Sequence, residues 1–421
     1  MISAKHHLRS IFEIFNVGRG PSSTHSMGPF RAARIFRQRC PQPPARIRVS
    51  LLGSLAATCE GHLTDQSIAA ALQNTDLELI RDTRDQPLPH PNTMRFEAFD
   101  ETGRSIAEWE VYSVGAGNLE DPSGTVGGGP DVAYPFSTIR EAMDYCETHG
   151  QLFWQVVELT EADLWDRLER IWERMREAVE RGLASGQVVL PGPLKLRRRA
   201  KGCLAHARML DSPQRDVALI SAYALAVAEE NAEGAVVVTA PSCGSSGVVP
   251  GVLYYFEENK DVPRREILQA LATAGLFGTV IRAHASISGA EVGCQGEIGS
   301  ACSMAAAAAS QLLGGTLFQI EYAAEIAMEH HLGLTCDPVE GYVQVPCIER
   351  NMTAALRAFE CATFSLLTDG RHLISFDDVI AVMDETGHDL QQAYRETGRG
   401  GLALLWQRRR GTQPARGRTS C

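Results

Sequence analysis

The hydrophobic pattern of the chain changes near residue 160, and this change constrains the fold more than any other feature. Before it, apolar residues alternate in short runs such as "RIRVSLL" from Arg46 and "EWEVYSV" from Glu108, which predicts half-buried strands. After it, apolar residues recur at helical spacing, as in "EADLWDRLERIWERMREAVERGLASG" from Glu161. The sequence therefore predicts the α+β class, with an N-terminal α+β domain followed by a mostly α-helical domain.

The same pattern divides the chain into four predicted parts. They are an α+β domain over residues 1–160, a connecting helix and basic linker over 161–200, a helical domain over 201–408 and an Arg-rich tail over 409–421. The tail has almost no apolar content, so it is predicted to be disordered. Helices are predicted at 217–231, 264–283, 301–313, 321–331, 352–367 and 376–385.

Charge and composition exclude several classes of protein. A net charge of -11 gives no support for nucleic-acid binding. No run reaches the roughly 18–20 apolar residues that a membrane span needs, and the N-terminus lacks the apolar core of a signal peptide. We therefore expect a cytoplasmic protein with no membrane partner. Its 11 cysteines are then expected to stay reduced and to serve packing, metal binding or catalysis.

Three cysteines lie in Gly- and Pro-rich segments near helix ends. Cys294 is in "SISGAEVGCQGEIGSACSM", and Cys336 and Cys347 are in "HHLGLTCDPVEGYVQVPCIERN". Three thiolates suit an iron–sulfur cluster with one incompletely ligated iron, which can act as a Lewis acid. Their wide spacing does not match a zinc module, in which cysteines are closely paired. Spacing alone leaves open that these are three unrelated loop cysteines or a structural zinc site.

The stretch "GPSSTHSMGPF" from Gly20 places hydroxyl side chains and a histidine between glycine and proline residues. Ser22, Ser23 and the backbone amides of this turn could bind a carboxylate, and His25 could transfer a proton. The residues by themselves favour a simpler interpretation. Ser and Thr are good helix caps, and His25 could be a packed core histidine.

Several long segments of the sequence resemble segments of the bacterial iron–sulfur L-serine dehydratases in their single-chain form. They include the three segments above together with "GHLTD", "HPNTMRF", "TAPSCGSSGVVPGVL" and "ETGRGGLAL". The resemblance implies an N-terminal domain like the allosteric serine-binding domain of some phosphoglycerate dehydrogenases. It also implies a catalytic domain with a [4Fe-4S] cluster on Cys294, Cys336 and Cys347. The open iron would polarise the hydroxyl of L-serine, without pyridoxal phosphate, to yield pyruvate and ammonia in amino-acid catabolism that feeds gluconeogenesis.

The resemblance also implies roles for individual residues. His25 is the first candidate for proton transfer and His62 the second; Ser22, Ser23, Ser242 and Gly244 are candidates for substrate binding; and Cys421 is a weaker candidate for a fourth ligand. Cys243 and Cys302 are expected to be core thiols, and Glu291 and Glu297 helix-start carboxylates. The substrate partner is L-serine, and a homodimer is expected. Alternatives are a hydro-lyase for another β-hydroxy amino acid such as L-threonine, and a non-catalytic serine-binding regulator.

Overall fold

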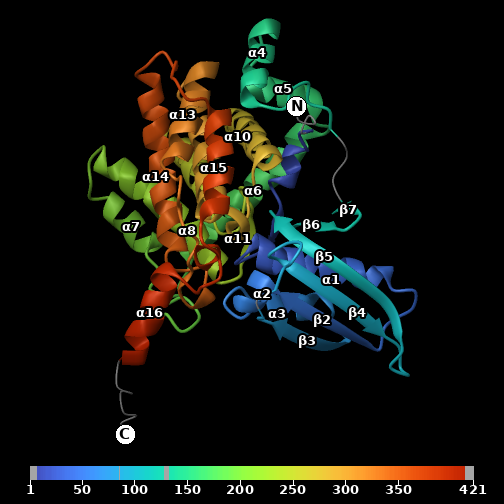
Figure 1. The fold of residues 1–421 in the computed structure, drawn as a ribbon. Helices are drawn as coiled ribbons and strands as arrows, with labels where there is room; N and C mark the ends of the chain where they lie inside the picture. Colours follow the sequence, from blue (N-terminus) through green and yellow to red (C-terminus); the bar gives the residue numbers. More distant parts are fainter. Residues whose placement is uncertain (1–6, 85, 128–131, 413–421) are drawn as a thin grey trace, which may run out of the picture.

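The computed structural model describes residues 7–84, 86–127 and 132–412. A six-stranded sheet with its helices forms one part of the molecule, and a group of long helices forms the other (Figure 1). The predicted α+β class is confirmed, with the sheet in the N-terminal third and helices in the remainder. Within the described residues, no helix has the length and apolar character needed to cross a membrane.

The sheet is built around strand β2, whose alternate side chains Ile47, Val49 and Leu51 are fully buried. β3 pairs with β2 in parallel, and the other strands follow antiparallel in the order β3-β2-β4-β5-β6-β7. Their apolar side chains pack against helices α1 and α3 in one core. The elements are β2 (Arg46–Leu52), β3 (Asp76–Asp82), β4 (Thr93–Phe99), β5 (Ser105–Gly115), β6 (Asn118–Asp121), β7 (Gly124–Val126), α1 (Gly28–Arg39), α2 (Gly53–Ala57) and α3 (Thr64–Ala71).

The helical part surrounds α12, whose residues Ser300 to Ser310 are all buried. Their small side chains let α9, α10, α13 and α14 pack closely around this helix. α6 and α8 also pack closely, because Gly182 lies against the backbone of Ala226. The main helices are α6 (Leu164–Ala184), α7 (Ala200–Ala207), α8 (Gln214–Ala232), α9 (Val248–Asn259), α10 (Arg264–His284), α12 (Ser300–Leu312), α13 (Leu317–Glu329), α14 (Cys347–Leu366) and α15 (Phe376–Asp389).

The two hydrophobic cores do not separate at the predicted boundary of residue 160. The core beneath the sheet is drawn from residues 32–126. Helices α4 (Ile139–His149) and α5 (Phe153–Thr160) belong to the core of the helical part, where the ring of Phe153 meets that of Phe277 edge-on at 5.4 Å. The reason is that both helices carry one apolar face, which they bury against α10 and its neighbours.

The last described helix, α16 (Gly401–Thr412), extends past the predicted start of the tail at residue 409. The remaining tail residues, and with them Cys421, lie outside the described residues. At the other end of the chain, β1 (Val17–Arg19) pairs antiparallel with β8 (Val236–Val238). This pair fixes the N-terminal segment to the helical part, so the residues that follow β1 lie at the junction of the two parts.

Candidate functional site

The three predicted cluster ligands line one narrow cavity at this junction. Cys294 lies between α11 (Gly289–Val292) and the π-helical turn η3 (Gln295–Gly299), Cys336 lies in a loop, and Cys347 begins α14. All three are free thiols, and Ser22, His62, Gly244, Glu297 and Glu396 also line the cavity. The ligand atoms of Cys294, Cys336 and Glu297 lie within 4.8 Å of one another.

A buried arginine faces these sulfur atoms. Arg350 lies one turn after Cys347 on α14, and its guanidinium donates to the carbonyl of Thr335 at 2.6 Å. Burial disfavours the charge of Arg350, but attraction to the three cysteines outweighs burial and raises the pKa of its guanidinium. A hydrogen bond from Cys336 and, more weakly, Arg350 lower the pKa of the Cys294 thiol. The surroundings therefore favour a thiolate at this point of the cavity.

The donor set fits a thiolate-bound cluster. Three thiols without a disulfide partner among the described residues line one cavity beside the guanidinium of Arg350, and cysteine thiolates are the ligands that hold iron–sulfur clusters. The absence of a side chain at Gly289 lets its backbone lie close to Cys336 and Glu297. A Cβ at this position would lie 3.2 Å from the sulfur of Cys336 and 2.7 Å from Oε2 of Glu297. Cys294, Cys336 and Cys347 are therefore the residues that would hold the cluster.

The Ser/His stretch both caps a helical turn and contributes a residue to the cavity wall. Residues Ser23–Met27 form the π-helical turn η2, and Ser22 caps it by accepting from the backbone amide of His25 at 3.1 Å. Ser22 also lines the cavity, so capping leaves it available at the site. Ser23 is buried, does not line the cavity, and its hydroxyl has no hydrogen-bond partner among the described residues.

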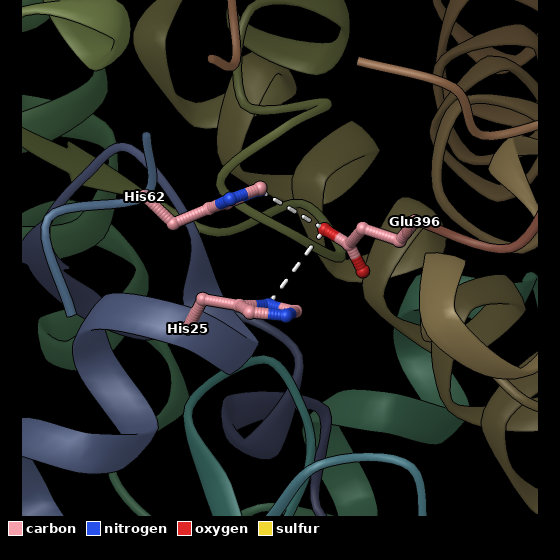
Figure 2. Close-up of side chains that lie close together, drawn as sticks. All are labelled: His25, His62 and Glu396. Atoms are coloured by element: carbon pink, nitrogen blue, oxygen red, sulfur yellow. Dashed lines mark ion pairs between the residues drawn. The ribbon is translucent and has the colours of Figure 1, made fainter. Parts of the chain in front are cut away.

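His25 and His62 stack on each other and face the carboxylate of Glu396 (Figure 2). Their ring centroids are 4.5 Å apart, and Oε1 of Glu396 lies 3.3 Å from Nε2 of His62 and 3.7 Å from Nδ1 of His25. Burial lowers the pKa of His25 to about 4, so this ring is neutral near pH 7. Burial raises the pKa of the Glu396 carboxyl, but the two histidines outweigh burial and lower it overall.

The two histidines differ in their access to the cavity. His62 lines it, whereas His25 is fully buried and its ring nitrogens lie 2.8 Å from the hydroxyl of Thr24 and 2.9 Å from that of Ser54. The sequence analysis put His25 first for proton transfer and His62 second. The geometry brings His62 to the cavity and places His25 behind it.

The second predicted substrate loop lies between β8 and α9. Its Gly244 lines the cavity, and Nδ2 of Asn351 on α14 donates to the Gly244 carbonyl at 2.6 Å. Ser242 does not line the cavity, and its hydroxyl lies 3.1 Å from that of Ser245. Asn351 therefore holds this loop against the helix that begins with Cys347.

Glu396 is a site residue that the sequence analysis did not single out. It follows the short helix η5 (Gln392–Tyr394), and its segment runs parallel to the Cys336 loop. The amide of Cys336 donates to the carbonyl of Tyr394 at 2.7 Å, and the amide of Glu396 donates to the carbonyl of Cys336 at 2.8 Å. In the sequence, the segment "ETGRGGLAL" served only as part of the family resemblance. A single glutamate among glycines could also have been recognised there as a candidate functional residue.

Two further residues contribute more than the sequence indicated. Arg350 had no assigned role, and Glu297 was expected to be a helix-start carboxylate, which it is, in the first turn of η3. In the structure Glu297 is buried in the cavity wall, and burial, together with Glu396 and Cys294, raises the pKa of its carboxyl well above the usual range. Cys302 and Cys243 are core thiols as expected, since Cys302 contacts the carbonyl of Ala354 and Cys243 contacts the sulfur of Met27.

Comparison with known proteins supplies a family for this site. A family model described as serine dehydratase beta chain matches residues 10–84, and one described as serine dehydratase alpha chain matches residues 66–403. The chain is 40% identical to an L-serine dehydratase of Streptomyces coelicolor, over 94% of this chain and 98% of that protein. It is 37% identical to L-serine dehydratase 1 of Escherichia coli, over 94% of this chain and 99% of that protein. The chain therefore belongs to the serine dehydratase family, with the beta-type and alpha-type regions in one polypeptide.

Proposed function

We propose that the protein is a lyase that converts L-serine to pyruvate and ammonia, with a [4Fe-4S] cluster held by Cys294, Cys336 and Cys347. Family membership supports dehydration of serine. The observation that carries the proposal is that three free thiols, two of them buried, and a histidine–carboxylate pair line the same cavity. When bound, the cluster would supply a Lewis-acidic iron that polarises the hydroxyl group of the substrate.

The chain's own residues would bind and orient the substrate. The hydroxyl of Ser22, which lines the cavity, would bind the serine carboxylate. The Gly244 loop forms the opposite wall and presents backbone close to the substrate, because Gly244 has no side chain to block it. Ser242 would act indirectly, by holding this loop through its contact with Ser245.

His62 is placed to remove the α-proton. Its Nε2 reaches the cavity and the carboxylate of Glu396, which stabilises the imidazolium formed when the ring accepts a proton. Loss of the α-proton and the β-hydroxyl leaves aminoacrylate, which tautomerises to an imine and takes up water to give pyruvate and ammonia. His25 is placed behind the pair, where it packs on the His62 ring and fixes its orientation.

Anaerobic purification and cysteine substitution test this proposal. The wild-type protein should contain iron and acid-labile sulfide and should form pyruvate from L-serine. Cys294→Ser, Cys336→Ser and Cys347→Ser should each lose cluster and activity, while Cys302→Ser, which changes a buried thiol outside the cavity, should keep both. Well-folded protein without iron or sulfide, or with a zinc ion in their place, would overturn the proposal.

The same preparation tests the remaining expectations. Parallel assays with L-threonine distinguish the two β-hydroxy amino acids as substrates. Light scattering after size-exclusion chromatography tests the proposed homodimer, and fractionation of the source cells tests the proposed cytoplasmic location. Turnover that depends sigmoidally on L-serine concentration would support an allosteric site in the N-terminal part.

A further inference from the structure

A second cavity lies at the junction of the two parts, separate from the cavity of the cysteines. Its volume is about 310 Å³, at the lower end of the range typical of small-molecule sites. One wall comes from α2 and the segment after β3, and the other from the segment that includes residues 392–399. α2 lies at the end of the sheet nearest the helices (Figure 1). A ligand here would contact both parts of the molecule.

Some of the charged side chains that line this cavity have ion-pair partners and others do not. Three of them already have partners: Arg84 pairs with Asp82 at 2.5 Å, Glu291 with His90 at 3.2 Å, and His388 with Asp384 at 3.6 Å. Arg395 and Arg399 also line the cavity, and no carboxylate among the described residues lies within ion-pair distance of either guanidinium. Arg395 donates only to the backbone carbonyl of Glu291 at 3.2 Å, and its Nε is buried without a partner. The cavity is therefore lined by two guanidinium groups without an ion-pair partner in the described part of the chain and by one carboxylate, Glu291, whose partner His90 is charged only when it is protonated.

We propose that this cavity binds a small dianion, either a phosphate-bearing molecule or a dicarboxylate, and that its binding steadies Glu396. Guanidinium groups bind phosphate and carboxylate oxygens through paired hydrogen bonds. Thr83 and Gln392 add a hydroxyl and an amide to the wall. Zwitterionic L-serine is a poor occupant, because its net charge is zero and its ammonium group would face the two guanidinium groups. This site is therefore distinct in chemistry from the proposed substrate site.

The connection to Glu396 runs through its neighbours. Arg395 and Thr397, on either side of Glu396, both line the second cavity. Ser54 lines it as well, and its hydroxyl donates to the carbonyl of Glu396 at 2.8 Å and lies 2.9 Å from Nε2 of His25. A ligand that holds Arg395 against the α2 side restrains the backbone on both sides of Glu396. This coupling rests on the proposed function, whereas the binding site itself does not.

Calorimetric titration of the full-length protein tests the binding site. At constant ionic strength, inorganic phosphate or succinate should bind the wild type saturably, and the stronger of the two identifies the class of dianion. Binding should weaken at least tenfold in Arg395→Gln and in Arg399→Gln. It should be unchanged in Arg104→Gln, which removes an exposed charge at the β4–β5 turn. No saturable binding of either probe, equal binding in all variants, or displacement of the probe by equimolar L-serine would overturn the proposal.

Two measurements on the wild type complete the test without any substitution. The bound probe should slow amide hydrogen exchange in residues 392–399, and unchanged exchange there would count against the site. In the enzyme assay, a saturating probe should lower KM for L-serine or raise kcat, and unchanged values of both would overturn the coupling to Glu396. Saturable binding by a protein that does not turn over L-serine would refute the proposed function and leave the dianion site standing.

Discussion

Replacing Glu396 by Gln removes one charge from the proposed site while nearly preserving the shape of the side chain. Only the contact with Nε2 of His62, at 3.3 Å, is within hydrogen-bond distance; the contact with His25 is longer, at 3.7 Å. The structure gives the contact with His62 as an ion pair, and the hydrogen bond that it would form once His62 is protonated would contribute about 1.5–3 kcal/mol. At about 1.4 kcal/mol for each factor of ten, Glu396→Gln should lower kcat about 10- to 150-fold.

The loss should appear in kcat more than in KM, because the charge of Glu396 matters most once His62 carries a proton. The assay is steady-state formation of pyruvate by anaerobically purified variants, normalised to iron content. Glu325→Gln is a matched control, since it changes a buried carboxyl on α13 that does not line the cavity. A Glu396→Gln enzyme with full iron content and a kcat within twofold of the wild type would refute the role of this carboxylate.

Three further predictions concern stability, each measured by urea unfolding of the apoprotein. The pKa of His25 falls to about 4 on folding, so the unfolded chain binds a proton below pH 6.5 that the folded chain does not. About 3 kcal/mol of stability should therefore be lost as pH falls from 6.5 to 4, and His25→Gln should lack this component; equal pH dependence in both would contradict the prediction. Gly182→Ala should destabilise by about 1–3 kcal/mol, because its Cβ would lie 2.4 Å from the carbonyl oxygen of Ala226. Gly202→Ala, in α7 with open space around it, should instead stabilise by about 0.5–1 kcal/mol, and a loss of stability there would refute the packing argument.

Elements with a strong local pattern were predictable from the sequence. The strands from Arg46 and Glu108 and the helix from Arg264 are observed close to their predicted bounds. β3 was missed, because "DLELIRD" is largely charged and its side chains are at most half buried at the edge of the sheet. α9 was also missed, since the Pro and Gly of "VVPGV" in its first turns resemble a loop. Hydrophobic periodicity therefore predicted the strands and helices that bury one continuous face.

Candidate site residues could be predicted from the sequence where the residue type is chemically unusual for its local context. Residues that reach the cavity only through tertiary contacts could not be predicted in this way. Thiols in Gly/Pro loops and a histidine in a serine-rich turn attract attention on their own. Glu396 and Arg350 are common residue types, and only tertiary contacts give them a place at the cavity. The relative positions of His25 and His62 likewise depend on how η2 packs on the chain around Thr58, which no local pattern records.

The histidine–glutamate contact has a consequence for how such an enzyme must be assembled. His25 and His62 lie in the region matched by the beta-chain model, whereas Glu396 and the three cysteines lie in the region matched by the alpha-chain model. If the two regions were separate polypeptides, bringing His62 to Glu396 would be a bimolecular event that depends on protein concentration. Covalent fusion makes it intramolecular, with an effective concentration set by the tether between them. The single chain thereby guarantees equal amounts of both halves and makes the contact between His62 and Glu396 independent of protein concentration.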